Sequence, residues 1–445
     1  MKIRSILGLA ATASIAFAAC SGAATPAPAT PVATPPASTA PGDTPAPSTP
    51  AAATVRLQLQ WVPQAQFAGY FAAERQGYFA AEGLTVNIIP GGPDVIPQVA
   101  GSAPDGPEFT ISWVPKVLEA REQGSDLVNI AQIFQRSGTL SVSWADSGIG
   151  GPADFKGKKI GVWDFGNEFE VTAGALTEGF VAGTDYEKVI QPFDMSLLLN
   201  RQIDVAEAMI YNEYAQVLEA INPATGNLYQ PSDLSVINWN DYRVGMLQDA
   251  LFVRQAWLDA PGNRDIAVRF VRASLNGWIY CRDKPDDCIQ YTVDAGSTLG
   301  SGHQAWMMNE INALIWPSPA GIGSVDPISW ADTVKVSLTT GIIKTDPGLA
   351  PYVTDIWKEA LAGIDAAMDV KGETFTKGSV EVTAGGNSPD RGAPPAARSH
   401  RTHDGPAPRG AGRSHWGLAH GVPPGRRSAH GRPSRTSVAS SGRPS

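Results

Sequence analysis

Aromatic, amide and carboxylate side chains occur at the turns where predicted strands lead into predicted helices. Indole rings offer flat apolar faces to a heterocycle, and amides or carboxylates pair with its N–H and C=O groups. These residue types therefore predict a cleft that holds a flat heteroaromatic small molecule. The candidate ligand-binding residues are Trp61, Gln64, Gln66, Tyr70, Asp94, Trp113, Gln135, Trp163, Asn167, Glu168, Tyr211, Asn212 and Glu213.

Several of these candidates have a purely structural alternative. Any one of the tryptophans could be partly buried packing, because that is the common role of this residue. Tyr70 shares a predicted helix face with Phe67 and Phe71, which favours the core over the ligand. Asn167 and Glu168 could cap the helix that they begin.

Charge helps to choose among ligand classes. Arg136 is the lone cation in the candidate turns, which also hold Asp94, Glu168 and Glu213. A sulfonate or nitrate site requires N–H groups and a basic side chain. The turns therefore favour a neutral or weakly basic ring.

Alternating strand and helix patterns are expected to bring these turns together. Strands are predicted at 57–61, 85–89, 109–112 and 127–134, then at 159–162 and 205–210, with helices at 167–179 and 213–221. This is an α/β layout, and in open α/β sheets ligands bind beyond the carboxyl ends of the strands.

The chain between its unusual ends is too long for one core. About 330 residues usually divide into two units. We predict lobe 1 at 55–147 and 246–371 and lobe 2 at 148–245, with crossings near the glycine-rich segment 147–152 and near 240–246. Two crossings form a hinge that resists twisting.

A longer motif resembles a known family. Residues 60–84 carry the order QW-x-P-x-x-x-x-A-G-Y-x-A-x-x-x-G-Y-F-x-x-E-G-L, and 154–163 read DFKGKKIGVW, followed by Gly166-Asn167-Glu168. These segments resemble the solute-binding proteins of bacterial ABC importers. The similarity covers roughly 55–371 and is greatest to the branch of thiamine-pyrimidine-precursor and riboflavin binders, with sulfonate and nitrate binders as more distant relatives.

The resemblance implies a two-lobed periplasmic-binding-protein fold of type II, with two Rossmann-like lobes on a two-stranded hinge. It also implies a monomer that delivers its ligand to an ABC permease and its ATPase, without a cofactor. Riboflavin is the ligand we favour. Formylaminopyrimidine is the first alternative, and a sulfonate or nitrate is the second.

An enzyme is the rival class. Relatives of this fold that make the thiamine pyrimidine need, by resemblance, a reactive histidine, a cofactor-binding lysine and a cysteine-rich iron motif. Here no cysteine cluster occurs and no histidine precedes His303. Motifs for a nucleophile elbow, a zinc protease, a P-loop or dinucleotide binding are also missing from the sequence. We therefore expect no catalysis; a surface adhesin with the same fold is a third possibility.

The N-terminus predicts export. Residues 1–19 have a basic start and an apolar run of signal-peptide length, and Cys20 follows two alanines. We expect lipidation of Cys20 and attachment to the extracytoplasmic face of the cell membrane; an ordinary cleaved signal is the alternative. Residues 20–54 add an Ala/Thr/Pro-rich linker, too poor in apolar residues to form a core.

The remaining two cysteines flank a polar turn. In an exported protein Cys281 and Cys288 could form a disulfide, with a metal site as the weaker alternative; we expect no metal.

The C-terminal segment differs from the rest of the chain. Residues 391–445 hold ten arginines and one acid, so the remainder of this chain of net charge −9 carries −18. We predict that 387–445 is disordered and possibly the product of a shifted reading frame. A basic arm for nucleic acid or anionic lipid is the alternative, and we expect no nucleic acid partner.

Overall fold

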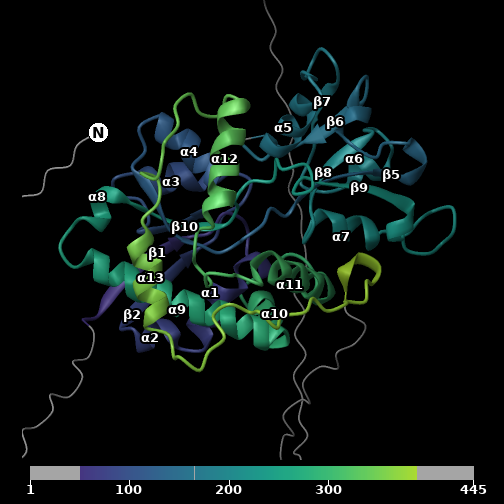
Figure 1. Ribbon diagram of the computed structural model, residues 1–445. Coiled ribbons are helices and arrows are strands. Elements are labelled where there is room, and N and C mark those ends of the chain that lie inside the picture. The colour runs from purple at the N-terminus through teal and green to yellow at the C-terminus, as the bar shows by residue number, and fades with distance from the viewer. Residues whose placement is uncertain (1–50, 165, 388–445) are drawn as a thin grey trace, which may run out of the picture. The chain divides into compact units, whose positions relative to one another are not determined.

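The structure, a computed structural model, describes residues 51–164 and 166–387. Its strands form two five-stranded sheets (Figure 1). The predicted signal peptide, Cys20 and the tail from residue 388 lie outside the described residues, as does the linker up to residue 50. In the described part, no helix has both the length and the hydropathy needed to cross a membrane.

The first sheet has the strand order β2-β1-β3-β10-β4. Its strands are β1 (Ala53–Gln58), β2 (Leu84–Ile89), β3 (Phe109–Ser112), β4 (Leu127–Gln132) and β10 (Ala250–Arg254). β1 pairs in parallel with β2 and β3, whereas β10 runs antiparallel between β3 and β4. Every residue of β3, β4 and β10 is buried, as expected for strands covered on both faces.

Helices cover both faces of the first sheet (Figure 1). On one face lie α3 (Pro97–Ser102), α4 (Val114–Glu122) and α12 (Pro327–Thr339). On the other lie α1 (Ala68–Arg75), α2 (Tyr78–Ala81), α9 (Asn263–Asp283) and α13 (Thr354–Ala362). The short α8 (Gln255–Leu258) follows β10. α1 and α9 pack closely because both lack side chains at their contact: a Cβ on Gly277 would lie 2.0 Å from the Gly69 carbonyl oxygen.

The second sheet repeats this arrangement with the order β7-β6-β8-β5-β9. Its strands are β5 (Thr139–Trp144), β6 (Lys159–Val162), β7 (Glu187–Ile190), β8 (Val205–Met209) and β9 (Leu234–Asn238). Its helices are α5 (Phe169–Thr177), α6 (Ser196–Leu199) and α7 (Glu213–Leu218). In each sheet the antiparallel inner strand, β10 or β5, is the first strand after the chain arrives from the other sheet. The predicted two-lobed type II fold is confirmed.

The first crossing lies earlier in the chain than the sequence suggested. β5 already belongs to the second sheet, so the chain passes between the sheets at residues 133–138 rather than at 147–152. The glycine-rich segment instead connects β5 to β6 within lobe 2, where Gly148 adopts a left-handed φ of 70°. The return lies at residues 239–249.

Hydrogen bonds join the two crossings to each other and to lobe 2. The Asn240 side chain accepts from the Ser137 amide at 3.2 Å and donates to its carbonyl at 2.9 Å. Glu170, buried in α5, accepts from the Ser137 hydroxyl at 2.8 Å and from the Met246 amide at 2.5 Å. Burial raises the pKa of Glu170 to about 7.

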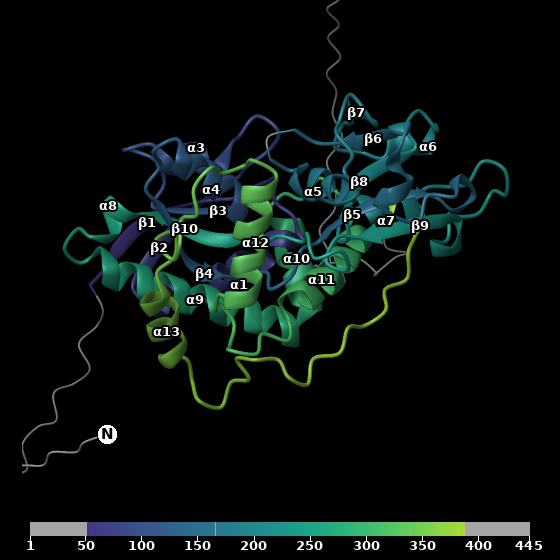
Figure 2. The same cartoon turned by 45° about the horizontal axis from the view of Figure 1, so that its top comes forward.

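A segment after α13, residues 364–387, also contacts both lobes. Its start lies along lobe 1, where the Ile322 amide donates to the Val370 carbonyl at 2.9 Å. Its end reaches lobe 2, where the Gly385 amide donates to the Glu219 carbonyl at 3.0 Å. Figure 2 shows this segment running from α13 toward α7. The predicted lobe 1 ended at residue 371, so the sequence did not indicate this third link.

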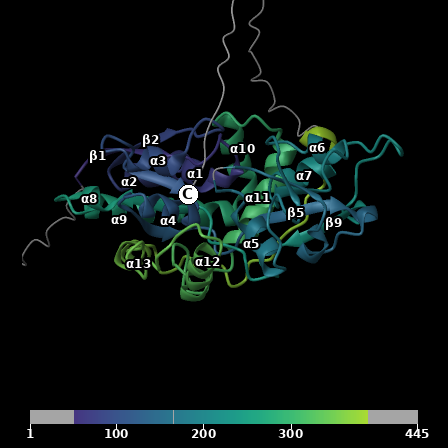
Figure 3. The same cartoon turned by 90° about the horizontal axis from the view of Figure 1, so that it is seen from above.

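Two further helices lie beside the lobe boundary. They are α10 (Pro285–Asp294) and α11 (Ser301–Ile315). α11 contacts α7 of lobe 2, and Figure 3 shows it between α10 and the second lobe. The structure joins Cys281 at the end of α9 to Cys288 in α10 through a disulfide with a Cα–Cα distance of 5.5 Å.

Candidate functional site

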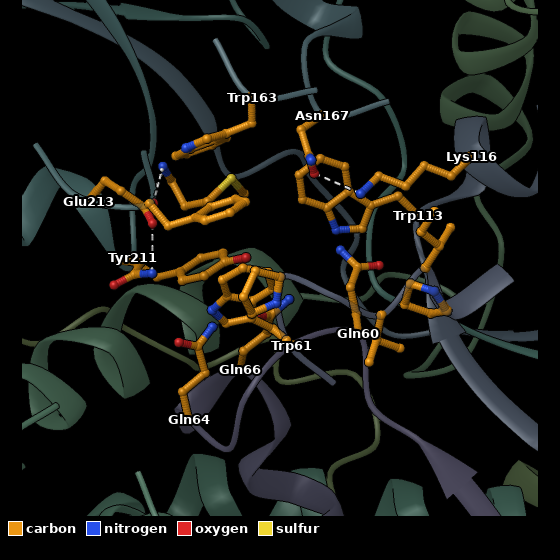
Figure 4. A pocket seen from close by; sticks show the side chains of 18 of the residues that line it. Gln60, Trp61, Gln64, Gln66, Trp113, Lys116, Trp163, Asn167, Tyr211 and Glu213 are labelled. Carbon is orange, nitrogen blue, oxygen red and sulfur yellow. Dashed lines mark hydrogen bonds between the residues drawn. The ribbon is translucent and has the colours of Figure 1, made fainter. Parts of the chain in front are cut away.

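A cleft that is partly open to solvent lies between the two sheets. Figure 4 shows side chains from both lobes pointing into it. The residues that line it are Gln60, Trp61, Gln64, Gln66, Gly92, Pro93, Val95, Ile96, Pro97, Gln98, Trp113, Lys116, Trp163, Asn167, Phe193, Met209, Tyr211, Asn212 and Glu213.

Aromatic rings from both lobes meet in this cleft. Trp61 follows β1, Trp163 follows β6, and Phe193 follows β7. The Phe193 ring centroid lies 4.5 Å from that of Trp61 and 6.2 Å from that of Trp163, with which it is nearly parallel. Phe193 is 44% exposed, so this ring lies at the open edge of the cleft.

Close backbone packing fixes the loop that carries Gln60 and Trp61. The Trp61 carbonyl accepts a hydrogen bond from the Gly91 amide at 2.9 Å. A Cβ on Gly91 would lie 2.6 Å from the Leu59 carbonyl oxygen and 2.7 Å from the Trp61 nitrogen. Glycine is therefore required at residue 91, because the loops after β1 and β2 touch there through their backbones.

A buried carboxylate organises the polar wall of lobe 1. Asp249 accepts from Gln66 Nε2 and from Trp113 Nε1, each at 2.8 Å, and Gln66 Oε1 in turn accepts from Gln64 at 2.6 Å. Burial raises the pKa of Asp249 to about 7, although these hydrogen bonds oppose the shift. Asp249 therefore sets the orientation of two cleft side chains.

Lys116 connects the lobes across the cleft. It lies in the first turn of α4, and its Nζ donates to Asn167 Oδ1 of lobe 2 at 2.6 Å. The ammonium also lies 4.4 Å from the centroid of the Trp113 ring, a cation–π geometry. Burial lowers the pKa of Lys116 to about 8, while surrounding carboxylates such as Asp249 oppose this shift.

Trp163 and the start of α7 form the wall of lobe 2. The Trp163 amide donates to the buried Glu207 carboxylate at 2.9 Å, and its indole N–H to the Pro192 carbonyl at 3.2 Å. Glu213 accepts from the Met209 amide at 3.0 Å and from Asn212 at 2.8 Å. Burial raises the pKa of Glu213 to about 7, so its carboxyl is partly protonated at neutral pH.

His303 of α11 holds Asn212 in place from outside the cleft. Its Nε2 lies 3.0 Å from Asn212 Oδ1, and its Nδ1 lies 2.9 Å from Glu219 Oε1. The side chain of His303 is almost fully buried. In the described residues, no group of three or more His, Cys, Asp or Glu side chains is arranged to hold a metal ion.

The structure brings most of the predicted residues into one cleft. Those that line it are Trp61, Gln64, Gln66, Trp113, Trp163, Asn167, Tyr211, Asn212 and Glu213. Trp61 and Trp163 thus share one space between the lobes instead of lying in separate cores.

Four predicted residues lie elsewhere. Tyr70 is buried in the core, edge-on to Trp278 with ring centroids 5.8 Å apart. Asp94 is exposed on the loop before α3. Gln135 donates to the Gln132 and Ser324 carbonyls at the first crossing. The Glu168 carboxylate accepts a hydrogen bond from the Gly166 amide at 3.1 Å and does not line the cleft.

The predicted cation was also wrong. The Arg136 guanidinium donates to the carbonyls of Ala313 and Leu314 at the end of α11, at 3.2 and 3.3 Å. Lys116 is the basic residue of the cleft lining. It follows Trp113 by three residues, in the same strand-to-helix turn, so the rule that selected Trp113 could have selected Lys116. Gln60 and Phe193 were missed as well.

The structure is thus a two-lobed α/β fold with a cleft at the lobe boundary. The model of the NMT1/THI5-like family matches residues 64–288, just over half of the chain, and the chain belongs to this family. A protein from Bordetella bronchiseptica RB50 has a similar fold, with a TM-score of 0.51 at 18% identity, covering 70% of this chain and 97% of that one.

Two curated relatives are similar in sequence. A formylaminopyrimidine-binding protein of Halalkalibacterium halodurans is 28% identical over 244 residues, which are 53% of this chain and 68% of the relative. The riboflavin-binding protein RibY of Chloroflexus aurantiacus is 25% identical over 298 residues, 65% of this chain and 81% of the relative.

Proposed function

We propose that this protein is the solute-binding component of an ABC importer and that it holds a flat heteroaromatic vitamin or vitamin precursor between its lobes. The names of the two relatives give the two candidate ligands, riboflavin and formylaminopyrimidine. Riboflavin is preferred, because its polyol chain can use the many amides of the lining.

One observation carries this proposal. Trp61 of lobe 1 and Trp163 of lobe 2 line the same cleft, with Phe193 between them at its edge. A ring inserted among these side chains contacts both lobes at once. Contacts made to both lobes stabilise the closed arrangement, and a permease can recognise that arrangement.

Isothermal calorimetry of the purified protein tests the proposal. We expect binding of riboflavin or formylaminopyrimidine and no measurable heat with taurine. Binding of taurine alone would instead favour the sulfonate class, with Lys116 as its cation. No heat with any of the three ligands would remove the proposed function.

A binding role also excludes turnover. We infer that the protein releases its ligand unchanged, and mass spectrometry of ligand recovered after prolonged incubation checks this. A product of altered mass would favour the enzyme class.

The proposed location is the outer face of the cell membrane, through a lipid on Cys20, with a monomeric binding domain. Incorporation of an alkyne-labelled fatty acid into the wild type and not into Cys20→Ser tests the anchor. Size-exclusion chromatography with light scattering tests the monomer.

A further inference from the structure

The cleft contains a buried ammonium group without a carboxylate partner. Lys116 is 6% exposed, and no carboxylate of residues 51–164 or 166–387 lies within ion-pair distance of its Nζ. An ammonium has three N–H donors, and the hydrogen bond to Asn167 Oδ1 uses one of them. Burying a charge without full compensation is costly, so Lys116 favours a ligand that offers another acceptor.

Gln60 is a hydrogen-bond acceptor in the same cleft that requires a donor. This residue is 7% exposed, and its Oε1 atom is buried without a hydrogen-bond donor among the described residues. In Figure 4, Gln60 lies on the Trp113 side of the cleft, opposite Glu213 and Tyr211. A buried acceptor without a partner is unfavourable, and a ligand N–H in this position would supply the missing hydrogen bond.

We propose that Lys116 and Gln60 together form a subsite for a carbonyl group with an adjacent N–H, as found in a lactam, an imide or a formamide. The ammonium of Lys116 donates to the carbonyl oxygen, and Gln60 Oε1 accepts the N–H. This inference rests on the proposed function and narrows its ligand class. Asn167, from the other lobe, holds the ammonium in place, so the subsite is complete only when both lobes contribute.

The subsite discriminates in two ways. A ligand that presents an ammonium group there meets a like charge at Lys116. A ligand that presents only acceptors, such as a sulfonate, leaves Gln60 Oε1 without a donor. The specificity of the cleft therefore depends on the pairing of one donor and one acceptor on the ligand.

Two ligand pairs test this subsite on the unmodified protein. Formylaminopyrimidine is compared with its deformylated amine, which carries a cation in place of the formamide. Riboflavin is compared with 3-methylriboflavin, which lacks the imide N–H. If the protein is a formylaminopyrimidine binder, we expect formylaminopyrimidine to bind about 10- to 100-fold more tightly than its amine. If it is a riboflavin binder, we expect the same factor between riboflavin and 3-methylriboflavin. Hydrogen bonds to charged or buried groups have this magnitude.

Variants then assign the preference to its residues. Lys116→Met keeps a straight side chain without the charge and should reduce the preference for the formyl ligand at least tenfold. Gln60→Leu should remove the preference for riboflavin over its 3-methyl derivative. Lys335→Met, which changes an exposed lysine on α12, is the matched control and should change neither ratio.

The outcomes separate the two proposals. If both members of each pair bind equally to the wild type, or if the variants keep its ratios, the subsite is wrong while the vitamin-binding function stands. If the wild type binds none of these four ligands, the proposed function fails and the subsite fails with it.

Discussion

Replacing Asp249 by asparagine should reverse the order of stability of variant and wild type as the pH rises. Asp249 is 3% exposed and accepts from Gln66 and Trp113 at 2.8 Å. Its φ of 33° lies in the left-handed region, which asparagine also tolerates, so the backbone can remain unchanged. An asparagine has one acceptor oxygen, so one of the two donors loses its partner, at a cost of about 1–3 kcal/mol.

The carboxyl group of Asp249 also makes the stability of the wild type depend on pH, and this effect favours the variant as the pH rises. Burial raises its pKa from 3.8 to about 7 in the folded state. Between these values the folded protein binds more protons than the unfolded chain, so the free energy of unfolding falls as the pH rises. At 1.36 kcal/mol per pH unit the total loss is about 4 kcal/mol, and it is complete above pH 7. The asparagine variant lacks this loss.

The two contributions together predict a crossover. Asp249→Asn should be less stable than the wild type near pH 4 and more stable at pH 8, with equal stability between about pH 4.5 and 6. Urea denaturation followed by tryptophan fluorescence at each pH measures the difference in free energy of unfolding between variant and wild type. The contributions of the buried Glu170 and Glu213 are the same in both proteins and cancel in this difference. Asp241→Asn, at an exposed residue, is the control. A difference that stays constant from pH 4 to pH 8 would refute the reasoning.

Three further substitutions test separate parts of the structure. Gly91→Ala should destabilise the protein by about 1–3 kcal/mol and weaken ligand binding, because the added Cβ would lie 2.6 Å from a backbone atom. Gly150→Ala, where the nearest atom is 4.0 Å from the added Cβ, is the control and should change neither stability nor affinity. Denaturation measures the stability and calorimetry the affinity. Phe193→Ala should weaken ligand binding about tenfold with an unchanged melting curve, because the ring is exposed at the cleft edge. Replacing Cys281 and Cys288 by serine should cost about 2 kcal/mol, or roughly 3 °C in the melting temperature, with unchanged affinity; an unaltered melting curve would contradict this.

The sequence predicted the cleft residues best where a buried strand ends in a turn. β3 and β6 are short and almost fully buried strands, and Trp113 and Trp163 directly follow their carboxyl ends. Phe193 was missed because the preceding strand β7 (EKVI) is short, mostly exposed and begins with two charged residues, so no strand was predicted there. Tyr70 lies in the core, as the helix face that it shares with Phe67 and Phe71 favoured, although its partner there, Trp278, lies far along the chain.

The lobe boundary shows the same limit. β5 reads TLSVSW, and its alternation of polar and apolar residues does not reveal which sheet it joins. Membership is decided by pairing with β8 and β9, which follow much later in the sequence. Asp249 could not be predicted as an organiser of the cleft either, because its role depends on two partners that β10 brings close in space.

A crystal structure of the protein with bound riboflavin or formylaminopyrimidine tests the central claim most directly. We predict that the ligand ring lies in the cleft, in contact with Trp61 of lobe 1 and Trp163 of lobe 2, with a carbonyl oxygen within hydrogen-bond distance of Lys116 Nζ. A ligand bound to one lobe alone, or outside the cleft, would contradict the account.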